Sequence, residues 1–459
     1  MDENNNIIFD SQEENVTGLS PDEGESTHSS HTHDGSHHSH HHHHHHHSPH
    51  HSSGKRRKNQ KLNKFIKRNK FKIANVFVAV LFVSVLVVLG VLIDTNKHLS
   101  DKDSTDTSSG EILTEDSIQI EIPLFDEDVL IVGPAVKAYA DADSSVQAVS
   151  IYNDYIALGQ LDAGLPVTLY YNIKGMPAGC SVKDSKILVS ENEDFSSSNV
   201  YSLSADETRK DVYHLKTNTQ YYYRIDVSLS NGTQTSVSGS FKTADTPRFL
   251  SVDGVRNMRD IGGYKTVNGK TVRQGMLYRS TELDGKVEPR FAITPEGRDD
   301  MLSVLGIRTD MDLRSAKDNP DGTDALGAGV RHNYYSAPMY DEVFTEEGKA
   351  AIRKIFSDLA DKNNYPVLMH CTHGMDRTGT VCYLLEAVLG MSEEDMMKDY
   401  QFSSLCHGKL WGVNEMNEFI GRLKAYDGAT IQEKAESYLI STGVTEAEIA
   451  AIREIFLEN

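Results

Sequence analysis

Hydrophobic and polar positions follow different patterns in successive parts of the 459-residue chain. Residues 1–54 have almost no apolar periodicity and are rich in Ser, Asn, Glu and His, which is typical of a disordered tail. Residues 73–93 are apolar and carry no charge. Residues 118–244 show short alternating runs, and residues 246–459 mix short apolar runs with helical spacing. The pattern predicts two folded parts, an N-terminal module (118–244) and a C-terminal domain (246–459).

The apolar segment 73–93 is long enough to cross a bilayer core of about 30 Å as one helix. A buried globular helix would not normally be apolar on every face, and a cleaved signal peptide would be shorter and nearer the start. Residues 55–72 hold ten Lys or Arg and no acid, so the positive-inside rule places them on the cytoplasmic side. We expect a single-pass anchor in the lipid bilayer of the cell membrane. The polar stalk 94–117 and everything after it would then be extracytoplasmic.

Within residues 118–244, alternate positions from Tyr221 to Leu229 are apolar, which predicts a strand with one buried face. Asn231-Gly232 predicts a hairpin turn into a return strand. Leu215 and Tyr221 are spaced like the tyrosine corner of a β-sandwich. This part resembles a fibronectin type III-like module, which implies a spacer or docking role.

The C-terminal domain alternates β-like runs with helical patterns, which implies an α/β fold with a largely parallel sheet. The expected strands are 308–313 and 366–369, and the expected helices are 295–305, 346–360 and 378–389.

Composition changes this picture only in part. The net charge is −21, and the one basic block directly precedes the apolar segment, which argues against a nucleic-acid partner. Four scattered cysteines with no Cys-x-x-Cys pair give no disulfide framework and little support for a zinc site. Fifteen histidines between His28 and His51 leave two interpretations open, a metal-binding tract or a solvated low-complexity tail.

The densest chemistry lies between the strand 365–369 and the helix that starts near Thr378. The sequence there contains Cys371, then five residues, then Arg377-Thr378-Gly379. A strand–loop–helix joint aims backbone N–H groups and a helix N-terminus at one point, which makes a phosphate cradle. The same positive potential lowers a cysteine pKa and populates the thiolate, and an arginine fork can hold two phosphate oxygens. No metal or other cofactor is needed for this chemistry.

With the flanking His370, Gly374 and Asp376, this segment resembles the loop of the bacterial and fungal branch of the tyrosine phosphatases, which reads His-Cys-x-x-Gly-Lys-Asp-Arg-Thr-Gly. Three further stretches of residues 250–459 are similar to motifs of that branch: 257–264 followed by 277–280, 312–315, and 399–400.

The resemblance implies an α/β phosphatase domain in which Cys371 is the nucleophile, Arg377 the phosphate clamp and Asp376 the general acid. Thr378 would steady the leaving thiolate. The remaining loop positions would contact substrate, and these are Thr372, His373, Gly374, Met375 and Gly379. Met375 stands where the branch has Lys, and losing that charge should weaken the binding of multiply charged substrates.

Other residues keep two interpretations. Arg259 and Asp260 could be catalytic or could form a salt bridge that braces the loop. Asp312 and Asp341 are reserve candidates for the acid, with Arg314 as a supporting residue beside Asp312. His370 is expected to support the loop through hydrogen bonds and His373 to face solvent or substrate, whereas Cys382 is expected in the core.

These observations favour a membrane-anchored, extracytoplasmic protein-tyrosine phosphatase-like enzyme that acts on phosphotyrosine proteins or small phosphate esters. Two rivals remain. The first is the same chemistry on a phosphoinositide or inositol phosphate. The second is a catalytically weak surface protein that binds phosphorylated ligands.

Overall fold

The computed structural model describes residues 118–409 and 412–458. The predicted tail, basic segment, apolar span and stalk all lie outside the described residues. All of the described residues belong to one compact unit. In the portion that the structure describes, no helix has both the length and the apolar character needed to span a membrane.

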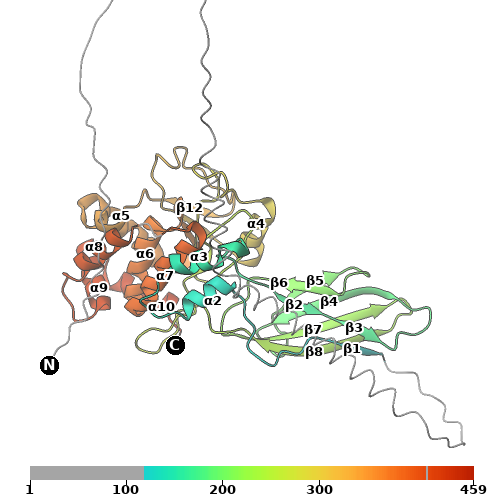
Figure 1. The fold of residues 1–459 in the computed structure, drawn as a ribbon. Helices are drawn as coiled ribbons and strands as arrows, with labels where there is room; N and C mark the ends of the chain where they lie inside the picture. Colours follow the sequence, from blue (N-terminus) through green and yellow to red (C-terminus); the bar gives the residue numbers. More distant parts are fainter. Residues whose placement is uncertain (1–117, 410–411, 459) are drawn as a thin grey trace, which may run out of the picture. The chain divides into compact units, whose positions relative to one another are not determined.

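The C-terminal domain is built on a five-stranded sheet with the order β12-β11-β13-β10-β9 (Figure 1). The strands are β9 Arg259–Asp260, β10 Leu277–Ser280, β11 Thr309–Asp312, β12 Arg331–Tyr334 and β13 Val367–His370. All neighbouring pairs are parallel except β9–β10, which is antiparallel. The prediction of an α/β domain with a largely parallel sheet is therefore confirmed.

Helices cover both faces of this sheet. They are α4 Pro295–Asp299, α5 Glu346–Leu359, α6 Asp376–Leu389, α7 Glu393–His407, α8 Val413–Leu423, α9 Ile431–Ser441 and α10 Glu446–Phe456. Alternation along β13 divides the core between the two faces. Val367 and Met369 pack in one cluster with residues of α5, α6 and α8–α10, whereas Leu368 packs in another with Met301 and Leu305.

Most of these helices begin where the sequence supplies a hydroxyl to cap the free backbone N–H groups. Thr345 caps α5 and Ser392 caps α7, and Thr430 and Thr445 form capping boxes at α9 and α10. Helix α6 is an exception because Met375 precedes it without a side-chain cap. Its first N–H groups therefore remain available at the end of β13.

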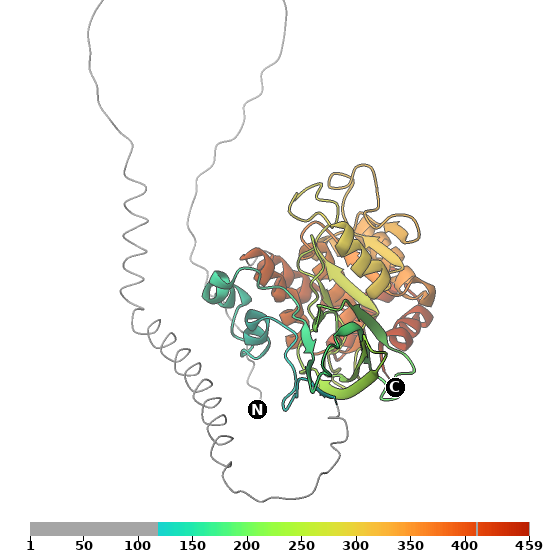
Figure 2. The ribbon, with the colours of Figure 1, turned by 90° about the vertical axis from the view of Figure 1, so that its right-hand side faces the viewer.

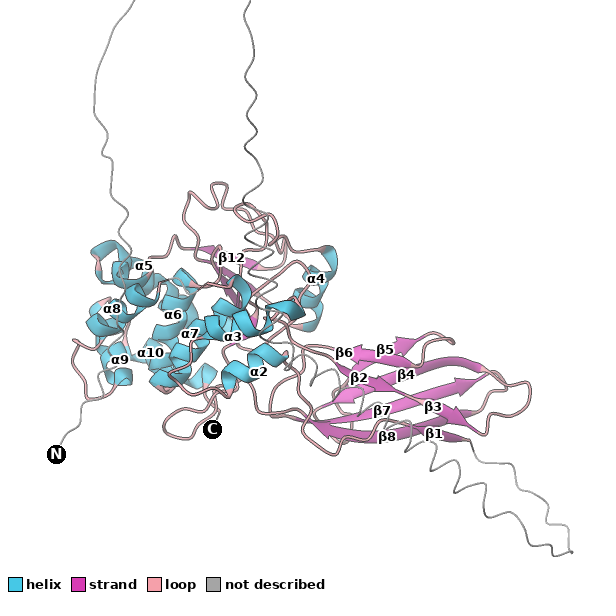
Figure 3. Ribbon diagram, viewed as in Figure 1, coloured by secondary structure: helices cyan, strands magenta, loops and turns pink. Residues whose placement is uncertain are grey.

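The N-terminal module contains a four-stranded antiparallel sheet with the order β5-β4-β7-β8 and two two-stranded sheets, β1-β3 and β2-β6 (Figure 3). The strands are β1 Gln119–Glu121, β2 Val167–Tyr170, β3 Asn172–Lys174, β4 Val182–Ser190, β5 Asn199–Leu203, β6 Arg209–Val212, β7 Gln220–Leu229 and β8 Gln234–Lys242. The β7–β8 hairpin forms as expected, with alternate residues of β7 buried and Gly232 at φ 91° in the turn. The Tyr221 hydroxyl accepts a hydrogen bond from the backbone N–H of Lys216, five residues upstream, at 2.8 Å. The fibronectin type III-like assignment stays a prediction.

One part of residues 118–244 is not strand. Residues 134–140 form helix α2 (Pro134–Ala140), and residues 148–155 form helix α3 (Ala148–Tyr155), followed by a short helix η1 (Ile156–Leu158). Pro134 suits the first turn of α2 because its missing N–H is not needed there. Both helices pack on α7 of the C-terminal domain, and Figures 1 and 2 show them beside the red C-terminal helices. An all-strand expectation missed them because their apolar faces cover the neighbouring domain rather than the module's own sheet.

Candidate active site

Cys371 lies directly after β13, and α6 begins five residues later at Asp376. The thiol is buried, with 3% of the residue exposed, and faces a pocket of about 210 Å³. The residues that line it are Val287, Asp318, Met339, Cys371, Thr372, His373, Asp376 and Arg377. The structure therefore brings together the predicted nucleophile, the predicted clamp and the predicted acid at one end of the sheet.

The backbone of the Cys371 loop (residues 370–379) is tied from outside the pocket. Thr372 O accepts from Glu282 N–H at 3.0 Å, and His373 O accepts from Asn257 Nδ2 at 3.1 Å. Gly374 O accepts from Arg279 at 2.9 Å. With these carbonyls engaged outside the pocket, the loop's N–H groups can converge on an anion inside it.

Gly374 is required in this loop for two reasons. Its φ of 66° lies in the left-handed region, and a Cβ added there would lie 2.2 Å from Ser280 O. Gly374 therefore allows the turn of the loop, and it does not line the pocket.

A buried arginine pair supports the loop from behind. Arg259 donates from Nε to Asp399 Oδ1 at 2.8 Å, and Arg279 donates to the other oxygen of the same carboxylate. Burial opposes ionisation of Asp399, but the two guanidinium groups hold its pKa below the usual range. Arg259 also donates to Asn257 Oδ1 at 2.6 Å, so this network orients the amide that holds His373 O.

Arg259 and Asp260 each form a buried salt bridge, with different partners. Adjacent residues of β9 point to opposite faces, so Asp260 pairs with Arg248 at 2.7 Å and accepts from the N–H groups of Gly262 and Gly275. Arg259 does brace the loop, with Asp399 as its partner, and neither Arg259 nor Asp260 lines the pocket.

Arg377 projects into the pocket and forms an ion pair with Asp318, Nη1 to Oδ2 at 2.7 Å. Burial raises the pKa of Asp318, but Arg377 and a hydrogen bond from Ser315 have the larger effect, so the pKa of this carboxyl lies below its usual value. Asp318 was not among the sequence candidates. Its only signal is its place in the polar loop after β11, at the edge where parallel strands end and ligands bind.

Asp376 is held by a pair of tyrosines. Its Oδ1 accepts a hydrogen bond from the Tyr340 hydroxyl, and that hydroxyl lies 2.8 Å from the hydroxyl of Tyr400. Burial and the Asp376 carboxylate raise the pKa of Tyr340 well above its usual value, so it remains a proton donor. Asp376 therefore sits at the first turn of α6 in a fixed orientation and lines the pocket.

Neither reserve candidate for the acid reaches the pocket. Asp312 is buried and accepts from Arg314 and from Asn319. Burial opposes its ionisation, yet His370, His332 and Arg314 together hold its pKa far below the usual range. Asp341 is exposed and pairs with Arg422 at 3.3 Å. A carboxyl locked as an ion pair and one that points into solvent cannot serve the pocket.

Arg314 belongs to a separate buried cluster. Besides Asp312 it contacts Glu282 at 3.0 Å and Asp284 at 2.7 Å. The backbone N–H of Glu282 in turn holds Thr372 O, so Arg314 supports the loop through that segment.

His370 is the last residue of β13 and directly precedes Cys371, and its role as a support of the loop stays a prediction. It is buried, and its Nε2 lies 3.1 Å from Asp310. Burial disfavours the imidazolium, but Asp310 and Asp312 raise the pKa of His370 to about 9. His373 lines the pocket and lies 3.7 Å from Glu288, with its ring 5.2 Å from that of His407.

Three loop residues with predicted roles at the phosphate do not line the pocket. Met375 is 1% exposed and packs in the main core, so its side chain does not occupy the space of a lysine that would reach substrate. Thr378 is fully buried, and its hydroxyl has no hydrogen-bond partner among the described residues. Gly379 allows α6 to approach α7, because an added Cβ would lie 2.7 Å from the Tyr400 ring. Cys382 lies in the core as expected.

Within residues 118–409 and 412–458, no group of three or more His, Cys, Asp or Glu side chains is placed to hold a metal ion. The His-rich tract is outside these ranges.

Residues 250–458 match the model of the tyrosine phosphatase family. A Cupriavidus necator protein named provisionally as a tyrosine-protein phosphatase is 27% identical over 177 residues, which cover 33% of this chain and 61% of that protein. A tyrosine-protein phosphatase of Nostoc commune is 25% identical over 126 residues, covering 23% of this chain and 43% of that protein. The chain therefore spans about three fifths or less of the length of these curated relatives.

Among solved structures, the core catalytic domain of a PP-IP phosphatase from S. cerevisiae, in complex with citrate, is 16% identical to this chain. The match covers 35% of this chain and 80% of that one, with a TM-score of 0.22. The family match coincides with the C-terminal domain, whose loop and sheet are described above.

Proposed function

We propose that the C-terminal domain hydrolyses phosphate monoesters through a cysteinyl-phosphate intermediate. The observation that carries this proposal is the position of Cys371. It lies at the junction of β13 and α6, in a pocket shared with Arg377 and Asp376, under a loop whose carbonyls are tied outward. The match of residues 250–458 to the tyrosine phosphatase family supports the same chemistry.

In the proposed reaction the Cys371 thiolate attacks phosphorus while the bond to the leaving oxygen breaks. The leaving oxygen keeps the bonding electrons and takes a proton from Asp376. Arg377 moves from Asp318 to the equatorial phosphate oxygens and stabilises the charge that they carry. Asp376, now ionised, then removes a proton from water, which attacks the cysteinyl-phosphate and releases inorganic phosphate and the thiolate.

The proposed substrate is a phosphotyrosine side chain in a protein. The pocket is lined by one arginine and one histidine against two aspartates, which suits a single phosphate group. A phosphoinositide carries several phosphates, and the position where the related branch has Lys holds Met375, buried in the core. The charge of the pocket thus supports the protein substrate over the inositol phosphates.

We also propose that the enzyme is anchored in the cell membrane by residues 73–93 and that its catalytic domain lies outside the cytoplasm. The support is the uncharged apolar run and the basic block 55–72 ahead of it.

The test is steady-state hydrolysis of a phosphotyrosine peptide, a phosphoinositide and an aryl phosphate by the full-length chain. We expect the peptide to give the highest kcat/KM, and we expect Cys371→Ser to reduce turnover by about 10²- to 10³-fold or more while phosphate binding survives. Cys180→Ser is the matched control, because Cys180 is half-buried in the N-terminal module.

Three results would contradict the proposal. Preferred hydrolysis of the phosphoinositide would move the substrate to lipids. Phosphopeptide binding without turnover by the wild type would support the phospho-ligand-binding rival. Turnover by Cys371→Ser within about tenfold of wild type would remove the nucleophile assignment.

A further inference from the structure

The N-terminal module and the C-terminal domain meet in an extensive interface, which we call the seam. Arg248 donates to the carbonyls of His214 and Leu215 in the module while it pairs with Asp260. Thr217 and Gln274 exchange two hydrogen bonds, at 2.9 and 3.0 Å. These contacts use backbone groups and buried side chains of both parts, so the module is attached at fixed positions.

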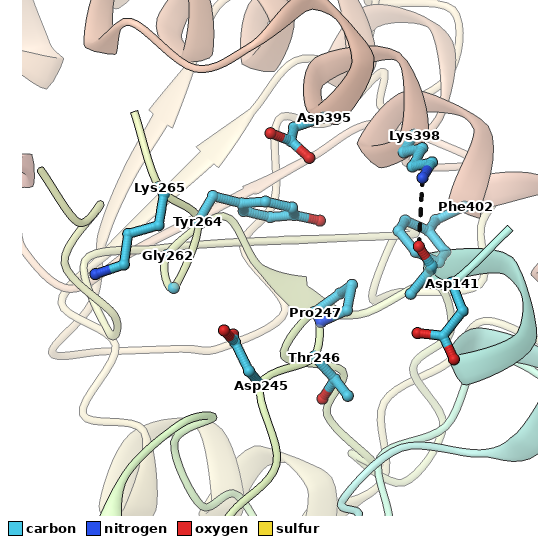
Figure 4. Close-up of a pocket in the computed structure, with 12 residues that line it drawn as sticks. Asp141, Asp245, Thr246, Pro247, Gly262, Tyr264, Lys265, Asp395, Lys398 and Phe402 are labelled. Carbon is cyan, nitrogen blue, oxygen red and sulfur yellow. Dashed lines mark hydrogen bonds between the residues drawn. The ribbon is translucent and has the colours of Figure 1, made fainter. Parts of the chain in front are cut away.

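Helices α2 and α3 extend this seam along α7. The Tyr139 hydroxyl donates to Gln401 at 3.0 Å, and the Tyr139 and Phe402 rings lie 5.0 Å apart. A pocket of about 280 Å³ is lined by the end of α2, by α7 and by residues 245–247 and 262–265 (Figure 4). On its edge Lys398 donates to Ala140 O at 3.3 Å, as the dashed line in Figure 4 marks. Cys371 does not line this pocket, which marks how far the seam extends along α7.

One charged residue of the module enters this seam completely. Asp162, between η1 and β2, is 1% exposed, and both of its carboxylate oxygens are engaged. Arg256 donates from Nε to Oδ1 at 3.0 Å, and the backbone N–H of Asn257 donates to Oδ2 at 2.6 Å. Burial, with a hydrogen bond to this carboxylate, also raises the pKa of the Cys406 thiol on α7. A carboxylate this deeply buried is maintained only when such partners are present.

The backbone around Asp162 is fixed as well. Gly164 lies so close to the C-terminal domain that an added Cβ would be 2.3 Å from Phe249 O. Ser251 Oγ donates to Gly164 O at 2.8 Å. The loop that carries Asp162 therefore cannot shift without moving the first residues of the C-terminal domain.

The residue that Asp162 holds is also the residue that holds the Cys371 loop. Asn257 donates a hydrogen bond from its backbone N–H to Asp162 Oδ2, and its side-chain amide donates to His373 O at 3.1 Å and Gly374 O at 3.3 Å. Asn257 has φ 53°, a left-handed backbone that a non-glycine residue keeps only when its surroundings impose it. Asp162 is the partner of the N–H group in this strained turn.

From these contacts we propose that Asp162 is a positioning residue for the phosphate-binding loop and acts through Asn257. The N-terminal module is then part of the catalytic unit rather than a passive spacer. This inference rests on the proposed function only for its effect on turnover. Its effect on the shape of the loop can be measured by anion binding alone.

The test compares Asp162→Ala and Asp162→Asn in the full-length chain. Alanine removes the acceptor for Asn257 N–H, whereas asparagine keeps one oxygen that can accept from this N–H, loses the charge and replaces the other oxygen with an NH2 group. We expect Asp162→Ala to lower kcat for an aryl phosphate, and to weaken the binding of inorganic phosphate, by about 10- to 100-fold, because small displacements of reacting groups have effects of this size. Asp162→Asn should recover most of both losses.

Val189→Ala is the control for general destabilisation. Val189 is buried in β4 within the core of the module and belongs to a different cluster from Tyr139 and Phe402 of the seam. The variants are assayed at a temperature where all are folded, and Val189→Ala should leave kcat and phosphate binding within twofold of wild type while lowering Tm.

The possible results separate this inference from the proposed function. If the wild type binds phosphate but does not turn over substrate, the proposed function is wrong, and the phosphate titrations still measure the role of Asp162. Phosphate binding and kcat of Asp162→Ala within twofold of wild type would overturn the positioning role. So would equal losses in Asp162→Ala and Val189→Ala at matched Tm, and so would a wild type that binds no phosphate.

Discussion

At the scale of single residues, the pocket presents two carboxyl groups with different surroundings. Asp376 accepts a hydrogen bond from Tyr340, a neutral donor, whereas Asp318 faces the guanidinium of Arg377. A neighbouring cation favours the ionised carboxylate, so Asp318 is poorly suited to donate a proton. We therefore expect Asp376 to be the acid and Asp318 to hold Arg377 in place before phosphate arrives.

This difference predicts a contrast between two variants. Asp376→Asn should reduce hydrolysis of phenyl phosphate by about 10²- to 10⁴-fold and affect p-nitrophenyl phosphate much less, because a good leaving group needs no proton. Asp318→Asn should change both substrates by a similar factor. Measuring kcat/KM on both esters decides the matter, and an equal loss on both esters for Asp376→Asn would mean that Asp376 only shapes the loop.

His370 gives a pH dependence whose sign can be worked out. Its folded-state pKa of about 9 lies above the unfolded value near 6.5, so the folded state holds a proton that the unfolded chain releases. The stabilisation is complete below pH 6.5 and is lost as the pH rises through 9. Its size is on the order of 3 kcal/mol at most.

The measurement is the free energy of unfolding in urea at pH 6, 7.5 and 9.5. Wild type should lose stability relative to His370→Gln across this range, since the variant lacks the titrating group while other groups are common to both. A constant difference between the two proteins would show that His370 has no raised pKa.

The sequence revealed the residues of this site unevenly, for a physical reason. Cys371, Asp376 and Arg377 are close in sequence, so one loop places all three in the pocket. Asp318 lies 59 residues before Arg377, the residue with which it pairs. Asp162 lies 209 residues before Cys371 and contacts Asn257. Only the tertiary fold brings them near, and no local pattern marks either one. Met375 was misplaced because its position in the loop does not reveal which way its side chain points.

At the scale of helices and strands, helical spacing predicted α5, which buries one face, and short β-like runs predicted β11 and β13, which are buried on both faces. The expected helix 346–360 and strands 308–313 and 366–369 appear within one or two residues of the predicted bounds as α5, β11 and β13. The predicted helix from Thr378 begins two residues earlier, at Asp376. The sequence has no capping hydroxyl there, so the local signal for the start of α6 was absent.

Packing between α6 and α7 depends on a glycine that helix propensity alone would disfavour. Gly379→Ala would place a Cβ 2.7 Å from the Tyr400 ring, so one helix must move. We expect a loss of stability of about 1–3 kcal/mol, as for other overpacked sites, with reduced turnover because Arg377 and Asp376 lie on the same turn. Gly421→Ala in α8 is the matched control, because nothing lies within 4 Å of its added Cβ.

Gly421→Ala should instead stabilise the protein, by up to about 1 kcal/mol, the difference in helix propensity between the two residues. Thermal unfolding of both variants compares them directly. Equal shifts of Tm in the same direction would show that the close approach of α6 and α7 has no energetic consequence.

At the scale of the whole molecule, the pattern of hydrophobic and polar positions predicted two folded parts, and the contacts show how they are joined. The change of pattern near residue 245 is real, because strands of the module end and the mixed sheet begins there. Yet α2, α3 and Asp162 bury surface against α7 and Arg256, so both parts fall in one compact unit. Alternating hydrophobic positions predict strands from sequence. The surface that covers a helix's apolar face cannot be predicted in the same way, because any apolar surface could cover it.

The last prediction concerns the side of the membrane on which this unit works. Ten Lys or Arg residues in 55–72 precede the apolar run 73–93, and moving such a block across a bilayer is strongly disfavoured. Protease added to intact cells should therefore remove residues 118–459 and spare the His-rich tail, as followed by antibodies to each end. Replacing the ten basic residues with Gln should weaken this orientation. Protection of the C-terminal domain in unbroken cells, with digestion only after lysis, would place the phosphatase domain in the cytoplasm and reverse the proposed topology.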